Sequence, residues 1–346
     1  MIKEWNLLRV IACLSIVLLH STTQLGLAIG YPDIELYDFY RLLLCYATPT
    51  FIVLSEIILA NRYPDKLPKG FWLKRLKYIY VPFLSFAVID ALVVHYFYPT
   101  IGIKDKLLEN AIYGDFEGYF ILIILQFYAL HYLITKYKIS VMWLLPFSIY
   151  CMSVYLDVVK GNAPILEGFK SYIPFLGWFA YFTIAFVIGK NYKKVAPKLR
   201  DNKWLTVIVF FISALIMYYS YVSGNTTVSS KRFDLLLFVF AASAMILAWG
   251  QLIPNYNIIN IISNYSFGIY LVHWQVQRFI APYIGNYFDH TSTRVISLFI
   301  ITLLISMLLI KLISMLPFGS FIVGQVNRKI SPRAVPERAK ELVQTA

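Results

Sequence analysis

Long apolar runs, separated by short charged or Pro/Gly-containing stretches, dominate this sequence. Each run is about 18 to 24 residues long, close to the roughly 20 residues that a helix needs to cross ~30 Å of hydrocarbon. We therefore predict an all-α, polytopic membrane helix bundle of about ten transmembrane helices. The predicted spans are 6–29, 38–60, 78–98, 117–135, 139–156, 172–190, 204–222, 234–253, 264–286 and 293–316.

The composition supports this interpretation. Of 346 residues, 59% are apolar and only 14% are charged, which is more apolar surface than a soluble globule of this size can bury. Cys13, Cys45 and Cys151 all fall inside apolar runs, so they are expected to be buried thiols and not a disulfide framework. The first apolar run lacks a cleavage site, which favours a retained span over a signal peptide.

The distribution of basic residues predicts the orientation of the bundle. Ten spans place both termini on one side, and the loops on that side carry about 20 Lys and Arg, against about 7 in the other loops. We therefore predict an N-in, C-in topology with 61–77 and 190–203 in the cytoplasm. The outer loops carry acidic residues, among them Asp33, Asp105 and Glu117. The loop 254–263 carries no charge, so the positive-inside rule does not assign it to a side. If the spans on either side of it were misjudged, the C-terminal half would have the opposite orientation, although the basic tail argues against that.

This topology also accounts for the net charge of +13, because segments typical of nucleic-acid binding are missing. No nucleic acid is therefore expected as a partner. We predict a membrane-embedded domain over 1–320 and a basic cytoplasmic tail over 321–346. Since no separate soluble domain is visible, any active site must lie among the helices.

Two ionisable residues lie in the first predicted span. Eleven residues separate Arg9 from His20, about three helical turns, so the two side chains should share one face and stand ~16 Å apart along the axis. Arg9 would lie near the cytoplasmic surface and His20 deep in the membrane. Ionisable groups at such depth are costly and mark functional sites by default. The alternative is a structural histidine with an arginine that snorkels to the surface.

Histidine suits acyl transfer because a neutral imidazole can take a proton from a hydroxyl at physiological pH. A metal site is not expected, because no residues have the spacing of metal ligands. His95 and His131 are scattered over other spans, where a lone histidine is more often part of the core.

The inner loop 61–77 ends in a basic cluster, Lys74, Arg75 and Lys77. Such a cluster is ordinary for a cytoplasmic loop. It would also attract the phosphates of an activated donor such as acyl-coenzyme A, and the two interpretations are compatible.

Two acidic residues, Glu56 and Asp90, lie within predicted spans. Each could pair with Arg9 or Arg41, or could orient a histidine. For Asp90 we favour a structural role, and for Glu56 both a structural and a functional role stay open.

Several segments together resemble the acyltransferase-3 family of integral membrane acyltransferases, and within it the bacterial poly-N-acetylglucosamine intercellular-adhesion O-succinyltransferases. The segments lie in the same order as in the family and extend over most of the chain. They are the Arg9 to His20 spacing, Pro49–Ser55, Lys74–Pro82, Gly118–Tyr128 and Ser266–His273. The resemblance implies that His20 is the catalytic base.

The sequence departs from the family pattern at two positions. Members commonly carry a second arginine three residues after the first in the basic motif, where this chain has Tyr78. The family also often has glycine after the serine of the second helix, where this chain has Glu56. The resemblance therefore carries a role to His20, matches the basic cluster only in part, and carries no role to Glu56.

The resemblance implies an O-acyltransferase of the bacterial plasma membrane that moves an acetyl or succinyl group from acyl-coenzyme A to a sugar hydroxyl. Arg9 and the basic cluster would bind the donor, and His20 would activate the hydroxyl directly or through a covalent acyl intermediate. Tyr270 and His273 would line the acceptor side. The resemblance transfers no role to Glu56, which stays a candidate acceptor-side or supporting residue because of its position inside a predicted span. The expected partners are a surface polysaccharide or exopolysaccharide, membrane lipid and a glycan synthase machinery, in biofilm formation or envelope modification.

A polysaccharide exporter or secondary transporter is the main alternative. Carriers commonly show internal repeats and paired broken helices, which this sequence lacks. A purely structural scaffold for a glycosyltransferase complex would leave Arg9 and His20 without a role.

Overall fold

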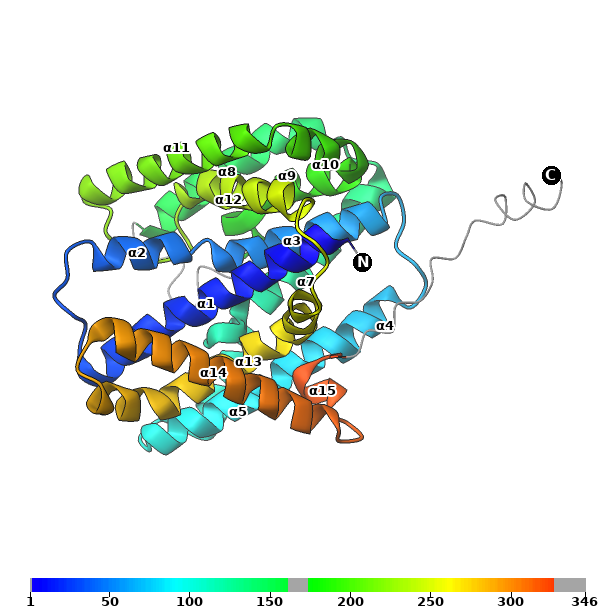
Figure 1. The fold of residues 1–346 in the computed structure, drawn as a ribbon. Helices are drawn as coiled ribbons and strands as arrows, with labels where there is room; N and C mark the ends of the chain where they lie inside the picture. The colour runs from blue at the N-terminus through cyan, green and yellow to red at the C-terminus, as the bar shows by residue number, and fades with distance from the viewer. Residues whose placement is uncertain (1, 161–173, 327–346) are drawn as a thin grey trace.

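The computed structural model describes residues 2–160 and 174–326, which form helices and loops without a strand (Figure 1). This confirms the prediction of an all-α bundle. Short 3-10 and π segments are labelled η. The elements are α1 (Lys3–Ile29), α2 (Tyr37–Leu44), α3 (Ala47–Arg62), α4 (Phe71–Arg75), η1 (Leu76–Tyr80), α5 (Val81–Phe97), α6 (Ile103–Tyr113), η2 (Glu117–Tyr119), α7 (Phe120–Tyr137), α8 (Val141–Lys160), η4 (Phe175–Trp178), α9 (Phe179–Lys190), α10 (Tyr192–Asp201), α11 (Lys203–Val222), α12 (Leu235–Gly250), α13 (Asn257–Tyr287), α14 (Thr291–Ser314) and α15 (Ser320–Val323).

All ten predicted spans overlap these helices, although the span 172–190 begins at residues outside the described ranges. Seven described segments are long and apolar enough to cross a membrane, and η4–α9 and α12 are shorter apolar helices. The ninth predicted span lies within α13, whose 31 residues exceed the length of a single crossing. The chain is thus a multi-pass membrane protein, and the number of ten crossings stays a prediction.

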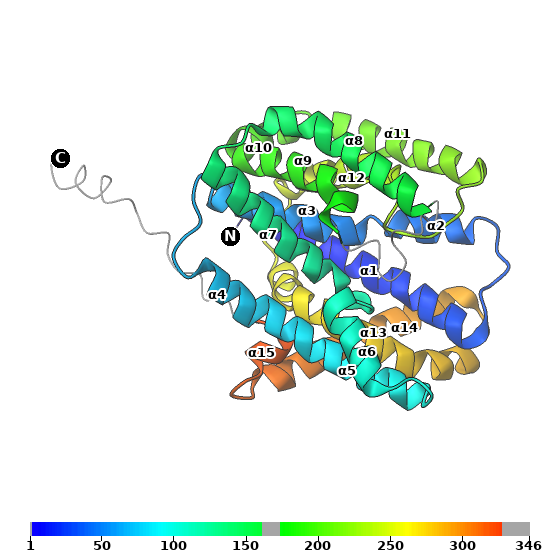
Figure 2. The same ribbon diagram turned by 180° about the vertical axis from the view of Figure 1, so that it is seen from behind.

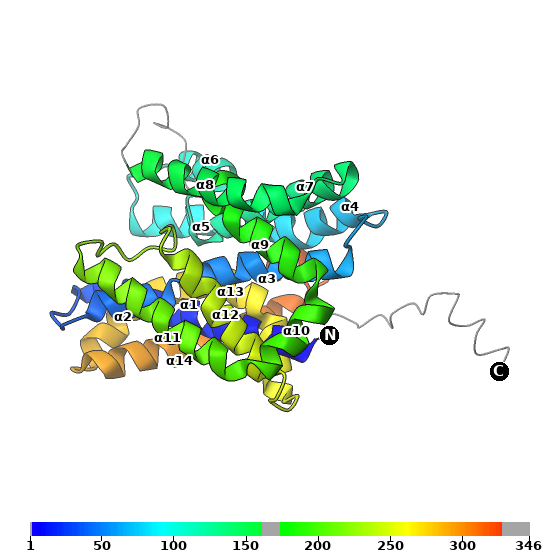
Figure 3. The same cartoon turned by 90° about the horizontal axis from the view of Figure 1, so that it is seen from above.

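Helix α1 lies at the centre of the bundle. It packs against α3, α12, α13 and α14 and separates the α11–α12 side from the α13–α14 side (Figure 1). Viewed from behind, α7 crosses in front of α1, and α5 lies below it (Figure 2). Seen from above, α5 to α8 form one side of the molecule, α11 and α14 lie on the other, and α3 and α9 lie between them (Figure 3). A residue on α1 can therefore contact several helices at once.

Helices α1 and α13 run parallel and in register. Hydrogen bonds join Asn6 to Asn260 at 2.8 Å and the Arg9 guanidinium to the Ser263 hydroxyl at 3.0 Å, and His20 lies beside His273. Parallel packing fits the predicted topology, in which the first and ninth spans cross in the same direction. It also confirms that Arg9 and His20 share one face of α1, because both contact α13.

The segment before α5 changes its helical winding. The α-helical turn of α4 ends at Arg75, a π-helical turn follows over Leu76–Tyr80, and α5 begins with Pro82 in its first turn. Proline is tolerated there because the first amides of a helix have no partner inside it. π-Turns are rare and occur often at functional sites, since they change the direction in which neighbouring side chains point.

The described C-terminal residues pack on the bundle. Helix α15 contacts α5, and Val323 and Val326 are buried. The packed part of the chain therefore continues beyond the boundary predicted at residue 320. The rest of the predicted basic tail, 327–346, lies outside the described residues.

Candidate active site

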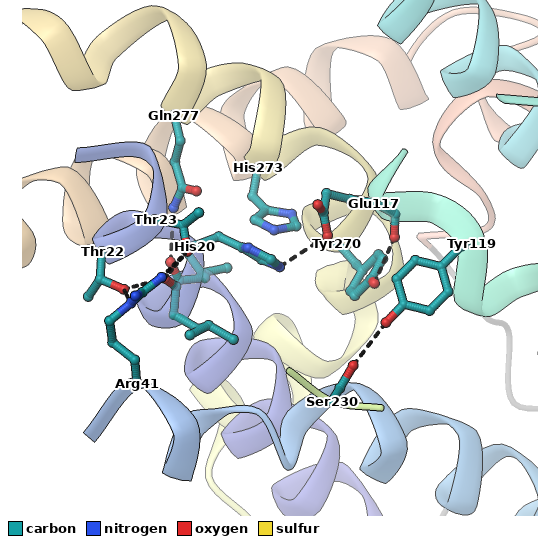
Figure 4. A network of polar contacts seen from close by, with 12 residues as sticks. His20, Thr22, Thr23, Arg41, Glu117, Tyr119, Ser230, Tyr270, His273 and Gln277 are labelled. Atoms are coloured by element: carbon teal, nitrogen blue, oxygen red, sulfur yellow. Dashed lines mark hydrogen bonds and ion pairs between the residues drawn. The ribbon is translucent and has the colours of Figure 1, made fainter. Parts of the chain in front are cut away.

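The side chains of His20 on α1 and Glu117 on η2 meet inside the bundle. Nε2 of His20 lies 3.2 Å from Oε2 of Glu117, and the two side chains are 13% and 26% exposed (Figure 4). The pair is thus shielded from bulk solvent but not sealed. Glu117 had been predicted only as one of several acidic residues in an outer loop.

This contact favours one tautomer of the neutral His20 ring. A carboxylate attracts the ring proton to the nitrogen nearest to it, which is Nε2. The lone pair of the neutral ring then lies on Nδ1, which has no hydrogen-bond partner among the described side chains. A histidine with one ring nitrogen oriented by a carboxylate and a lone pair on the other has the arrangement of a general base, and in this structure that second nitrogen is buried.

Two residues of α13 complete the surroundings of His20. The rings of His20 and His273 are 5.2 Å apart, and Trp274 packs edge-on against His20 at 4.9 Å. Nδ1–H of His273 donates to the Ile269 carbonyl at 3.0 Å, so the lone pair of His273 lies on Nε2, which has no partner among the described residues. His273 is fully buried. Two neutral imidazoles can therefore lie side by side without charge repulsion.

Tyr270 connects this group to the segment that carries Glu117. Its hydroxyl donates to the main-chain carbonyl of Glu117 at 2.8 Å, and its ring packs on Phe120 at 4.1 Å. The Tyr119 hydroxyl is hydrogen-bonded to Ser230 at 3.0 Å (Figure 4). These contacts hold the short η2 turn in place and with it the carboxylate of Glu117.

A cavity of about 170 Å³ has Tyr270 in its wall. Three arginines also line it, Arg9, Arg62 and Arg75. The remaining wall is mixed, with aromatic, aliphatic and hydroxyl side chains. Among the lining residues are Phe51, Ser55, Tyr63, Phe120, Tyr128, Asn264, Ser266 and Phe267. The cavity therefore combines three arginines with aromatic, aliphatic and hydroxyl side chains, and Tyr270 is part of its wall.

Only one residue of the predicted donor-binding cluster lines the cavity. Arg75 lines the cavity, with its guanidinium over the rings of Phe71 at 4.9 Å and Tyr128 at 5.0 Å. Lys74 and Lys77 are exposed and do not line it. Arg62, which had not been predicted as a site residue, lies there instead.

Of the two residues predicted on the acceptor side, Tyr270 lines the cavity that contains Arg9, and His273 lies between Tyr270 and His20. Both are therefore placed between the arginine-lined cavity and His20. Their roles in binding the acceptor stay predictions.

Glu56 lies away from His20 and is not a lining residue of the cavity. Its Oε1 is 2.7 Å from Nδ1 of His131, and both side chains are fully buried. Neither Arg9 nor Arg41 is its partner, because Arg9 bonds Ser263 and Arg41 pairs with Asp38 at 2.7 Å. The histidine that Glu56 orients is thus His131.

Asp90 has the structural position that its sequence context favours. Its carboxylate accepts hydrogen bonds from Asn110 at 2.9 Å and Gln275 at 2.7 Å, and Arg278 lies 3.6 Å away. These contacts tie α5 to α6 and α13 behind the His20 site.

The family model described as an acyltransferase domain, Acyl_transf_3, matches residues 2–311. The chain belongs to the acyltransferase-3 family. It is therefore a multi-pass membrane acyltransferase of the bacterial cell membrane, as the resemblance had implied. The residues of this family's motifs, far apart in sequence, converge here on one cavity and one histidine.

Curated relatives of this acyltransferase cover similar lengths. It is 38% identical to the "Putative membrane-bound acyltransferase YfiQ" of Bacillus subtilis (strain 168), over 79% of this chain and 80% of that protein. It is 25% identical to the "Probable poly-beta-1,6-N-acetyl-D-glucosamine export protein" of Staphylococcus aureus (strain MRSA252), over 82% and 85% of the two chains. The protein of the same name from Staphylococcus epidermidis is 27% identical over 82% and 83%. No solved structure matches.

Two site residues of this acyltransferase escaped the sequence analysis. Glu117 stands at the boundary between an acidic loop and an apolar run, where an acid is ordinary. Arg62 is one of several basic residues in the loop 61–77, which we predict to be cytoplasmic. The only available signal was position, since each lies within two residues of the end of a predicted span, and this signal is too common to be specific.

Proposed function

We propose that this acyltransferase moves an acetyl or succinyl group from acyl-coenzyme A to a hydroxyl of a cell-surface or exopolysaccharide sugar. The observation that carries the proposal is the chain of contacts from the arginine-lined cavity to His20. Tyr270 lines the cavity and contacts His273 and the Glu117 carbonyl, and both of these residues contact His20.

The cavity suits the donor in two ways. Guanidinium groups bind phosphates through paired, charge-assisted hydrogen bonds, so Arg9, Arg62 and Arg75 match a ligand with several phosphates. The aromatic and aliphatic lining residues, among them Phe51, Phe120 and Phe267, suit the uncharged arm that carries the thioester. With the phosphates at the cytoplasmic end, the thioester would reach toward Tyr270.

The His20 group supplies the chemistry of transfer. Nδ1 of His20 takes the proton of the acceptor hydroxyl while the hydroxyl oxygen attacks the thioester carbonyl. The carbon–sulfur bond then breaks, and the thiolate of coenzyme A leaves with the proton that His20 took from the hydroxyl, which returns the imidazole to its neutral form. The nearby carboxylate of Glu117 stabilises the positive charge that the imidazole gains. An equivalent sequence can pass through a covalent acyl intermediate.

The relatives support a glycan as acceptor. Two of them bear names that refer to poly-β-1,6-N-acetyl-D-glucosamine, a polymer rich in hydroxyl groups. We propose that the acceptor here is such a surface polymer and that the enzyme works beside the machinery that makes it, in biofilm formation or envelope modification.

Export is the second candidate, because the same names describe export proteins. A carrier for a polymer needs a continuous path for the chain, whereas this bundle places a carboxylate-oriented histidine next to an arginine-lined cavity. The buried chemistry favours transfer over export.

The test uses purified protein in lipid vesicles, offered labelled acetyl- or succinyl-coenzyme A together with a poly-N-acetylglucosamine oligomer. Label on the glycan from one donor supports the proposal and identifies the acyl group. Translocation of the unmodified oligomer without transfer from either donor would overturn it in favour of export.

A further inference from the structure

The end of α3 forms part of the cavity wall, and a buried pair of side chains, Glu56 and His131, is hydrogen-bonded to it. Arg62 is the last residue of α3, and both Arg62 and Tyr63 line the cavity. Glu56 and His131 lie on the side of α3 that faces α7, at 2.7 Å from each other and fully buried. Neither residue lines the cavity, so neither can touch a ligand there.

The pair reaches the cavity wall through the main chain. Nε2–H of His131 donates to the carbonyl of Tyr63 at 3.0 Å, and the amide of Tyr63 donates to Leu59 at 2.8 Å. The last carbonyls of a helix have no partner inside the helix and are usually free to fray. Here both main-chain groups of Tyr63 are held, so the turn that carries Arg62 is fixed.

The surroundings leave this pair little freedom. The His131 ring packs on Phe186 of α9 at 5.2 Å. Gly189 of α9 lies so close to α3 that a Cβ there would be 2.5 Å from the Ile57 carbonyl oxygen. Helix α3 is thus clamped between α7 and α9 beside the pair, and only its final turn depends on His131 for a hydrogen bond.

Burial makes the contact costly to break. With the Nε2 proton directed at Tyr63, one further proton lies between Nδ1 of His131 and the carboxyl group of Glu56. Loss of either partner leaves a buried polar group without its hydrogen bond. A pair that only stabilised the bundle could lie anywhere along α3 and α7. This one bonds the residue that follows Arg62.

We propose that Arg62 is a donor-binding residue and that the Glu56–His131 pair is its positioning device. The inference rests on the proposed use of coenzyme A, and it adds that the position of Arg62 depends on the hydrogen bond from His131 to the adjacent Tyr63. The pair acts on donor binding and not on the chemical step, because it lies behind the wall of the cavity and does not contact His20.

The experiment measures coenzyme A binding to the purified full-length protein in detergent by isothermal titration calorimetry. The variants are Arg62→Gln, His131→Asn, their combination and Glu56→Gln, with Arg75→Gln as a positive control. Lys66→Gln is the matched negative control, since Lys66 is an exposed cation of the same loop that does not line the cavity.

We expect Arg62→Gln to weaken coenzyme A binding about tenfold, the scale of one charge-assisted hydrogen bond. His131→Asn keeps an amide near Glu56 but cannot reach Tyr63, so it should weaken binding nearly as much. The double variant should bind coenzyme A no more weakly than the single variant with the lower affinity, because the two substitutions both act through Arg62. Glu56→Gln can still hydrogen-bond a neutral His131 and should retain most of the affinity.

Each other outcome has a definite meaning. Additive losses in the double variant, or a lower melting temperature of His131→Asn without weaker binding, would make the pair a stabilising contact only and overturn the inference. Weaker binding in Arg75→Gln with none in Arg62→Gln would remove Arg62 from the donor site while leaving the proposed function intact. If the unmodified protein bound no coenzyme A, the proposed function itself would fail.

Discussion

Nε2 of His20 lies 3.2 Å from the carboxylate of Glu117, although the two residues belong to segments that are far apart in the sequence. The contact joins α1 to the turn before α7, and Tyr270 of α13 holds that turn through a hydrogen bond to the Glu117 carbonyl. Three elements therefore define the orientation of one imidazole. The candidate base and its orienting acid are a property of the assembled bundle.

The first prediction concerns His20 itself. His20→Ala should lower the turnover number by about 10²- to 10⁴-fold, the usual contribution of a positioned general base. His20→Gln keeps a polar side chain of similar reach but cannot take a proton, so it should be equally inactive. The measurement is acyl transfer by monodisperse protein, and near-normal turnover of His20→Gln would eliminate His20 as the base.

The second prediction concerns Glu117. Glu117→Gln keeps an oxygen near Nε2 of His20 but loses the charge that stabilises the protonated ring, so turnover should fall by about 10²-fold with a nearly unchanged KM for the donor. Asp115→Asn is the matched control, because Asp115 lies in the same loop but pairs with Lys106 at 2.7 Å. Equal effects of the two substitutions would argue against a special role for Glu117.

The third prediction divides the basic cluster before α5. Arg75→Gln alone should raise the KM for the donor about tenfold and reproduce most of the effect of replacing all three cations, because only Arg75 lines the cavity. The Lys74→Gln/Lys77→Gln variant should change KM little at physiological salt, since exposed charges are screened. A larger effect of the lysine pair than of Arg75 would place the donor phosphates outside the cavity.

The fourth prediction treats Asp90 as a structural residue. Asp90→Ala leaves Asn110 and Gln275 without their shared acceptor in the bundle interior, so the melting temperature of the purified protein should fall clearly. The folded fraction should keep its donor KM. Normal stability combined with lost activity would instead assign Asp90 to the reaction.

The fifth prediction is the topology. Cysteines introduced at Asp33 and Lys66, both exposed and placed before and after the α2–α3 segment, should react with an impermeant thiol reagent from opposite sides of the membrane. The native thiols are replaced first, because Cys151 is partly accessible. Labelling of both positions from outside would contradict the N-in arrangement and the cytoplasmic donor site that depends on it.

The sequence by itself determined the fold class and the helices. Crossing hydrocarbon requires long apolar segments with internally satisfied backbones, and this requirement is visible residue by residue. It also identified Arg9 and His20, because ionisable residues inside an apolar run are rare and helical spacing places this pair on one face.

Only the tertiary structure decided which other residues line the cavity and which residues pair with the buried histidines. Whether a cation of a basic loop points into a cavity depends on the winding of the chain, and the π-turn after Arg75 and the fixed end of α3 leave Arg75 and Arg62 in the cavity wall but Lys74 outside it. Glu117 and His131 acquire their partners from helices that adjoin only after packing. Hydrogen bonds and ion pairs act over a few ångströms. Distances this short between atoms on different helices depend on how the helices pack and cannot be read from the spacing of residues along the sequence.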